Sequence, residues 1–309
     1  MKKDRRIFGK VLIVLTILFF YLPIVYMVVF SFNSSKSLTS FEGFSMQWYV
    51  KMLESHDMMT SLYTTIIVAI LATVISTFVG TITAIGLSKS RKAVRNLVSQ
   101  INDFPIMNPE IVTAIGLMLL FITFSINKGF MTLLLAHIAF CIPYVILSVM
   151  PKIRTLDPNL ADAAMDLGAT PWQAIRKVIM PQIAPGIFAG AIIAFTMSFD
   201  DFIISYFVTG DGVKNLSIMV YTMSKRVNPS INAISTLVVV LITIVLILVN
   251  VIPAIRKKMV KEEKTASHKA AKVTAGILVV AVLIGFFGIR HVVTPTGEYE
   301  GQTLHVYNW

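Results

Sequence analysis

Two adjacent carboxylates, Asp200 and Asp201, lie inside a long apolar stretch and are the residues best suited to chemistry. A charged group at the centre of a bilayer costs roughly 3 kcal/mol on insertion scales, so such groups usually face a protein cavity or a pathway. A negative charge there attracts a ligand with ammonium groups and repels anions. Because neighbouring positions on a helix differ in direction by about 100°, we expect at most one of the two to face a pathway. The alternative is an ion pair that holds two helices together.

Four further residues are candidates for lining a pathway. Glu110 follows an Asn-Pro pair, so it either lines the pathway or complements the dipole at a helix N-terminus. Trp48 lies in the first predicted external loop, where its ring either binds an ammonium group or anchors at the membrane interface. Ser198 and Tyr206 flank the acidic pair and are weaker candidates for polar lining.

The sequence lacks the groupings that most enzyme sites require. Gly9-Lys10 has no upstream glycine of a phosphate-binding loop, there is no H-E-x-x-H motif, and the five histidines are scattered. The single cysteine, Cys141, excludes a disulfide framework and a multi-cysteine zinc cluster. We therefore predict no catalytic residues, no metal site and no ATP hydrolysis by this chain alone. A membrane-embedded hydrolase would need a Ser, His and Asp constellation that the sequence does not show.

The composition predicts that membrane-spanning helices position these residues. Hydrophobic residues make up 56% of the chain, charged residues 14%, and the mean hydropathy is +0.77, which excludes an ordinary soluble domain. Seven apolar segments are long enough to cross a bilayer as helices. They cover residues 8–32, 62–88, 104–125, 130–150, 186–208, 234–255 and 273–289.

The basic residues predict the orientation of these spans. A cytoplasmic N-terminus places most of the 27 lysines and arginines inside, with the C-terminus outside a bacterial cytoplasmic (inner) membrane. The first apolar segment is long and lacks a small-residue cleavage site, so we expect it to be retained rather than removed as a signal peptide. The net charge of +11 then reports topology, not nucleic-acid binding. The basic clusters are also expected to contact anionic lipid headgroups.

A polar segment between the fourth and fifth predicted spans contains two helix signals. A helix can start at Asp157, which precedes a proline, and end at Gly168 in the left-handed conformation. A second helix can start at Thr170, again before a proline, and we expect it to stop near Met180, ahead of the next prolines. Such a compact helical pair either docks on a partner or lies on the membrane surface as an amphipathic hairpin.

This segment resembles the EAA signature loop of binding-protein-dependent ABC importer permeases. The resemblance rests on D-A-A-x-x-x-G followed by I-M-P. The family usually has glutamate in place of Asp162, so the acidic side chain here is one methylene shorter. The resemblance implies that residues 155–185 form a coupling loop that sits in a cleft on a partner ATPase and transmits its closure. The implied coupling residues are Asp162, Ala163, Ala164, Gly168, Ala169 and Pro181.

Other segments are similar to the C-type permease subunits of spermidine/putrescine importers, namely 32–37 (FNSSKS), 47–49 (QWY), 108–112 (NPEIV) and 198–210 (SFDDFIISYFVTG). The resemblance implies that residues 1–258 form a six-helix, type I ABC importer permease core that works by alternating access. It also implies a homologous second permease of B type, two ATPase subunits that bind ATP and Mg, and an extracytoplasmic polyamine-binding protein. No cofactor is expected in this chain.

The C-terminal part departs from that six-helix pattern. We expect a basic cytoplasmic linker at 259–272, a seventh transmembrane helix at 273–290 and an extracytoplasmic tail at 291–309. Residues 303–309 (TLHVYNW) resemble the opening strand of a polyamine-binding protein, which predicts a fused binding domain. The alternative is an extra anchor with a disordered tail. The predicted fold class is thus an all-α membrane protein with a six-helix core and one additional helix.

A secondary transporter or channel is the main alternative function. Such a protein works without nucleotide and often shows inverted repeats with broken helices. The sequence has no convincing internal repeat, and the resemblance of the loop around Gly168 to a coupling element argues against this alternative.

Overall fold

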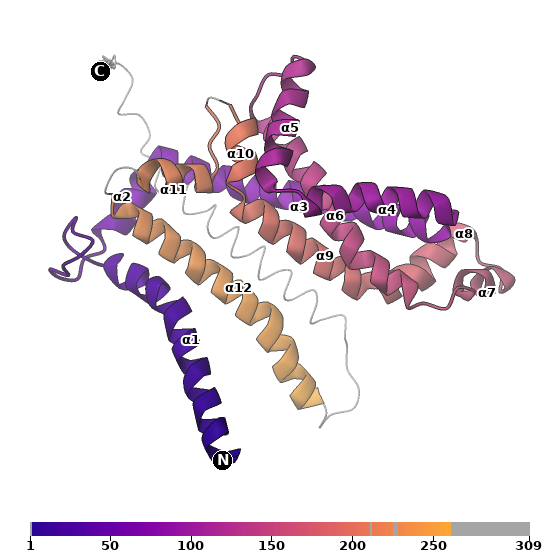
Figure 1. Ribbon diagram of the computed structural model, residues 1–309, viewed down its shortest axis with the longest axis horizontal. Coiled ribbons are helices and arrows are strands. Elements are labelled where there is room, and N and C mark those ends of the chain that lie inside the picture. Colours follow the sequence, from indigo (N-terminus) through magenta and orange to yellow (C-terminus); the bar gives the residue numbers. More distant parts are fainter. Residues whose placement is uncertain (1, 211, 225–227, 261–309) are drawn as a thin grey trace. The chain divides into compact units, whose positions relative to one another are not determined.

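The computed structural model describes residues 2–210, 212–224 and 228–260, and its regular elements there are helices (Figure 1). The chain divides into two compact units, Asp57–Arg226 and the combination of Met1–His56 with Val227–Trp309. We describe each unit by itself. The helices are α1 (Lys2–Phe30), α2 (Gln47–Glu54), α3 (His56–Lys89), α4 (Lys92–Met107), α5 (Glu110–Thr123), α6 (Phe130–Arg154), α7 (Leu160–Asp166), α8 (Pro171–Gln173), the π-helix η1 (Ala174–Ile179), α9 (Met180–Asp200), α10 (Ile203–Val208), α11 (Leu216–Ser224) and α12 (Ser230–Val260).

Four helical segments of the described chain are long and apolar enough to cross a membrane: Gly9–Phe30, His56–Lys89, Phe130–Arg154 and Pro171–Asp200. Each of these segments contains or largely overlaps one predicted span. The sixth predicted span, 234–255, lies within α12. The prediction of an all-α membrane protein is confirmed. The seventh predicted span and the predicted tail, together with most of the linker, lie outside the described residues.

The third predicted span is wrong as a single helix. The chain forms α4 and α5, which are bent by 108° at a break of two residues. Asn108 has ψ 148° and Pro109 has ψ 134°, so both are extended. A proline disfavours the helical conformation of the residue before it, and this Asn-Pro pair therefore ends α4 and lets a new helix begin at Glu110.

The fifth predicted span is also wrong as one helix, because α9 ends at Asp200. Asp201 is extended, with φ −63° and ψ 127°, and the short helix α10 begins two residues later. The two adjacent aspartates therefore do not belong to one helix. One ends α9, and the other lies in the break.

The expected stop before Pro181 is a third correction. Helix continues from Pro171 to Asp200 through the π-helical segment η1. Hydrogen bonds in a π-helix run from i to i+5, and this change in pairing falls just before Pro181, which has no N–H to donate. The second helix of the polar segment is thus continuous with a membrane-spanning helix.

Helices α3, α6 and α9 pack closely through small residues in the unit Asp57–Arg226. A Cβ added to Gly80 of α3 would lie 2.8 Å from the side chain of Val145 on α6, and one added to Gly190 of α9 would lie 3.2 Å from the backbone of Val145. Val145 itself is fully buried. Close approach at small residues is the usual way in which membrane helices associate.

Candidate functional site

Both helix breaks border one cavity of about 370 Å³ in the unit Asp57–Arg226. Glu110 at the start of α5 and the pair Asp200 and Asp201 at the end of α9 all line it. The structure thus brings Glu110 together with an aspartate pair that begins 90 positions later in the sequence. Irregular backbone within a membrane protein is tolerated where it is buried in protein or lines a cavity. The remaining lining residues are Pro105, Thr113, Phe140, Tyr144, Thr196, Met197, Phe202, Ile203 and Ile204.

Asp201 is a buried helix cap. Its side-chain oxygens accept hydrogen bonds from the backbone N–H of Ile204 at 3.2 Å and of Ser205 at 2.7 Å, and from the Ser205 hydroxyl at 2.7 Å. These donors belong to the first turn of α10, which a side-chain oxygen at the preceding break stabilises. The carboxylate of Asp201 is therefore fully engaged in holding α10 in place.

Asp200 has the opposite environment. Its side chain is exposed, and within the described residues its carboxylate has no hydrogen-bond or ion-pair partner. An ion pair between helices is therefore not seen for Asp200 in the described part of the chain. Of the two aspartates, Asp200 is therefore the one whose side chain lines the cavity without a partner among the described residues.

A buried polar network behind the cavity fixes Asp201. The Nε2 atom of His137 lies 3.0 Å from the Ser205 hydroxyl and 3.5 Å from Oδ2 of Asp201, and its Nδ1 atom lies 2.6 Å from the Ser198 hydroxyl. The amide of Asn215 donates to the Ser205 hydroxyl at 2.8 Å and to the Asp201 carbonyl at 2.9 Å. The network links α6, α9, α10 and the start of α11.

The hydrogen bonds of this network determine which ring nitrogen of His137 carries a proton. An ionised Asp201 only accepts, so the single hydroxyl proton of Ser205 is donated to it. The same hydroxyl oxygen must then accept from Asn215 and from Nε2 of His137. His137 therefore carries a proton on Nε2, an assignment that follows from the network. In the neutral imidazole, the Ser198 hydroxyl donates to Nδ1.

One residue predicted to line the pathway belongs to this network instead. Ser198 is 1% exposed and bonds to His137, and it does not line the cavity. His137 and Asn215 were missed by sequence reasoning. A polar residue within an apolar span was the available signal for His137, because such residues are costly and usually functional.

Tyr206 and Trp48 lie in different units. Tyr206 is largely exposed, and its ring centroid lies 5.6 Å from that of Phe202, which lines the cavity. Trp48 is buried and donates its indole N–H to the Asn33 carbonyl at 2.7 Å. The ammonium of Lys51 already lies 4.6 Å from the Trp48 ring centroid. The predicted contacts of Trp48 and Tyr206 with a ligand remain predictions.

Besides the second helix that continues past Pro181, the polar segment 155–185 departs from its predicted local structure at one further point, the start of its first helix. Asp157 does not cap a helix at Pro158. Its side chain accepts the N–H of Asn159 at 2.9 Å in a turn, and α7 begins at Leu160. The Asp157 turn thus satisfies the backbone just ahead of the helix.

The junction between α7 and α8 matches the prediction. Gly168 has φ +86°, the left-handed conformation that ends helices. The N–H of Gly168 bonds to the Met165 carbonyl at 2.8 Å, and that of Ala169 bonds to the Ala164 carbonyl at 3.1 Å. Thr170 then caps α8 through a reciprocal pair of hydrogen bonds with Gln173.

The tip of this junction is exposed and partly apolar. Leu167 is 91% exposed and Trp172 is 67% exposed. Asp162, Ala163, Gly168 and Pro181 are also exposed, while Ala164 and Ala169 are partly buried. Large apolar side chains at a protruding turn are typical of a surface that a partner covers.

Comparison with known proteins identifies the family. Residues 76–260 match the model of the binding-protein-dependent transport system inner membrane component. This range contains both helix breaks, the cavity residues and the segment 155–185. The chain belongs to this family. It is a multi-pass inner-membrane protein, as the composition predicted, and a transport subunit, as the resemblance predicted.

Individual permeases of this family are similar over most of the chain. The spermidine/putrescine transport system permease protein PotC of Escherichia coli K12 is 34% identical over 230 residues, which are 74% of this chain and 87% of PotC. The putrescine transport system permease protein PotI of the same organism is 35% identical over 236 residues, 74% of this chain and 84% of PotI. A PotC homologue of Mycoplasma genitalium is 30% identical over 258 residues, with coverage of 79% and 90%.

Solved ABC importers share the permease fold. A bacterial ABC transporter involved in the import of the acidic polysaccharide alginate matches with a TM-score of 0.67 at 17% identity, over 83% of this chain and 98% of the other. An alginate transporter in complex with its pentasaccharide-bound periplasmic protein matches with a TM-score of 0.59 at 16% identity, with coverage of 78% and 93%. At this identity the similarity establishes the fold alone.

Proposed function

We propose that this chain is a transmembrane subunit of an ATP-driven polyamine importer, and that the cavity lined by Glu110, Asp200 and Asp201 lies on the substrate pathway. The observation that carries the proposal is the convergence of three carboxylates at two helix breaks. The names of the similar permeases, which specify spermidine and putrescine, support the same substrate class.

The charge of the cavity favours an organic cation. Among the described residues that line the cavity, three are acidic and none is a lysine or an arginine. A polyamine carries several ammonium groups, which a low-dielectric acidic cavity attracts. The same charges would repel an acidic polysaccharide such as the substrate of the structurally similar alginate importer. The lining aromatic residues Phe140, Tyr144 and Phe202 offer further surfaces for ammonium groups.

The two aspartates are proposed to have separate tasks. Asp200 and Glu110 are exposed carboxylates and would contact the substrate. Asp201 would hold the wall of the cavity, because its oxygens are engaged by α10. Irregular backbone between half-helices is a recurrent feature of binding sites in transporters.

The segment 155–185 is proposed to couple the pathway to a partner ATPase. Its exposed tip carries Leu167 and Trp172, and its second helix continues without interruption through α9 to Asp200. A displacement of this tip by the ATPase would therefore be transmitted along one helix to the cavity. The partners would be a B-type permease, two ATPases that bind ATP and Mg, and either a separate polyamine-binding protein or a binding domain fused after residue 290. The tip would be cytoplasmic, as would the N-terminus, and transport would follow alternating access.

The test is uptake by the complete complex in proteoliposomes, with the ATPases, the second permease and a binding protein present. Asp200→Asn and Glu110→Gln should reduce ATP-dependent uptake of labelled spermidine while leaving the amount of assembled complex unchanged. Glu54→Gln is the matched control, because it removes one exposed negative charge from α2. Loss of uptake in strict proportion to loss of assembly would contradict the pathway role.

A further inference from the structure

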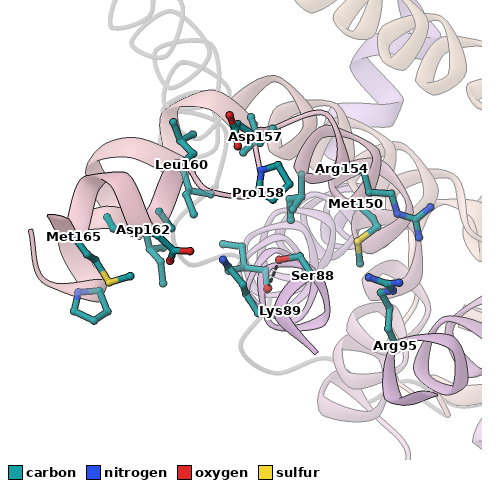
Figure 2. Close-up of a pocket in the computed structure, with 18 residues that line it drawn as sticks. Ser88, Lys89, Arg95, Met150, Arg154, Asp157, Pro158, Leu160, Asp162 and Met165 are labelled. Atoms are coloured by element: carbon teal, nitrogen blue, oxygen red, sulfur yellow. Dashed lines mark hydrogen bonds between the residues drawn. The ribbon is translucent and has the colours of Figure 1, made fainter. Parts of the chain in front are cut away.

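A second and larger cavity, of about 680 Å³, lies beneath the segment 155–185 in the same unit. Its walls come from the ends of α3 and α6, from α4, and from α7, α8 and η1 (Figure 2). Lys89, Arg95 and Arg154 line it from three different helices. Three cations that converge on one cavity from separate helices form a site that the proposed transport pathway does not use.

The two guanidinium groups of this cavity have no counter-charge at ion-pair distance in the part of the chain that the structure describes. Figure 2 shows Arg95 and Arg154 with their guanidinium groups turned toward one another at one end of the cavity. Within the described residues, neither group nor the ammonium of Lys89 has a carboxylate within 4.0 Å. Like charges that point together repel each other, and a bound anion would remove that repulsion.

The acidic residues of this cavity are occupied or distant. Asp157 already accepts the N–H of Asn159. Asp162 lies at the other end of the cavity in Figure 2, with Lys89 between it and the arginines. With three cations and two carboxylates, the lining of the cavity carries a net positive charge. Arg95 and Arg154 are the cations without a carboxylate partner among the described residues.

The lining favours one class of anion. Guanidinium groups bind phosphate oxygens in a bidentate manner. Beside them the walls are apolar and include Ile85, Met150, Ile153 and Leu160. A charged end beside an apolar wall, at the ends of membrane-spanning helices, matches an amphiphile with a phosphate headgroup.

We propose that Arg95 and Arg154, assisted by Lys89, bind a phosphate group in this cavity, and that the phosphate belongs to an anionic phospholipid. A bound headgroup would tie α4 to the end of α6 and, through Lys89, to the end of α3, and the acyl chains would lie against apolar side chains of α7 and η1 such as Leu160 and Ile179. The lipid would thereby brace the segment that we propose to face the ATPase. This site does not depend on the proposed transport function, because binding is measured directly.

The test is native mass spectrometry of the full chain, purified from detergent supplemented with phosphatidylglycerol. Wild type should retain the lipid, and Arg95→Gln combined with Arg154→Gln should lower retention by about tenfold or more, because two charge-assisted hydrogen-bonding groups are removed. The control is Arg91→Gln combined with Lys92→Gln, which removes two exposed charges nearby that do not line the cavity. An equal fall in both double variants would overturn the site.

Two further measurements distinguish a lipid phosphate from free phosphate and control for misfolding of the variants. Arg95→Lys with Arg154→Lys keeps both charges and should restore part of the retention. Inorganic phosphate is added in a parallel thermal-shift measurement on the full chain. One result would overturn the lipid as the source of the phosphate. In it, inorganic phosphate raises the melting temperature of wild type but not of the glutamine double variant, and wild type retains no phosphatidylglycerol. The absence of both signals in a monodisperse wild-type sample would overturn the proposal entirely.

Discussion

Replacing Asp201 with alanine should destabilise the protein far more than the same change at Asp200. Asp201→Ala removes the acceptor for two backbone N–H groups of α10 and for the Ser205 hydroxyl. Loss of a helix cap costs about 1 kcal/mol, and a buried donor left without a partner costs roughly 1–3 kcal/mol. The sum is about 2–4 kcal/mol, of which repair by a trapped water would recover a part.

The neighbouring substitution has no such cost. The Asp200 side chain is exposed and has no partner in the described part of the chain, so Asp200→Ala should change the free energy of unfolding by less than about 0.5 kcal/mol. Asp201→Asn should be intermediate, because asparagine is also a good helix cap but cannot accept at both positions.

The assay is thermal unfolding of the purified chain in one detergent at one protein concentration. A change of 1 kcal/mol shifts the melting temperature of a domain of this size by about 2–4 °C, so Asp201→Ala should lower it by about 4–16 °C. Asp200→Ala should stay within about 2 °C of wild type. Equal destabilisation by the two alanine variants, or a native melting temperature for Asp201→Ala, would refute the capping role of Asp201.

Three further predictions follow from single contacts. Nitrogen-15 NMR of labelled His137 should show a proton on Nε2 at neutral pH, because Ser205 uses its own proton on Asp201, and a signal from the Nδ1-protonated tautomer would contradict the network. Gly168→Ala should cost about 1 kcal/mol, because a residue with a Cβ is strained at φ +86°, although the space around it is open; an unchanged melting temperature would contradict this. Gly80→Ala should lower the melting temperature, because atoms of Val145 would lie 2.8 Å from the new Cβ. In a double-mutant cycle, Val145→Ala should recover part of that stability. Purely additive losses of stability would argue against the contact.

Local chemistry in the sequence predicted local structure well. The left-handed Gly168 and the cap at Thr170 are both present, because neighbours within a few residues determine these conformations. Four predicted spans, 8–32, 62–88, 130–150 and 234–255, correspond to single long helices, since a long apolar run in a membrane satisfies its backbone only as a helix.

The breaks were missed because apolarity alone does not distinguish one long helix from two shorter ones. At Asn108 the signal was present in the following proline but was used only to place a helix start. At Asp201 no local signal decided the matter, because the partners that complete the cap network are brought in by the fold. His137, for example, lies 64 positions away in the sequence, on α6. Contacts at that separation depend on helix packing, which the sequence alone does not show.

The central claim is most directly tested by the substrate selectivity of the complete complex in proteoliposomes. ATP-dependent uptake should be seen with labelled spermidine or putrescine, and it should be absent with a neutral sugar and with an acidic oligosaccharide. Each substrate should be measured with and without ATP, and with a binding protein present. Stimulation of ATP-dependent uptake by the anion or the sugar, and by neither polyamine, would contradict the proposal that the carboxylates around Asp200 serve a cationic substrate.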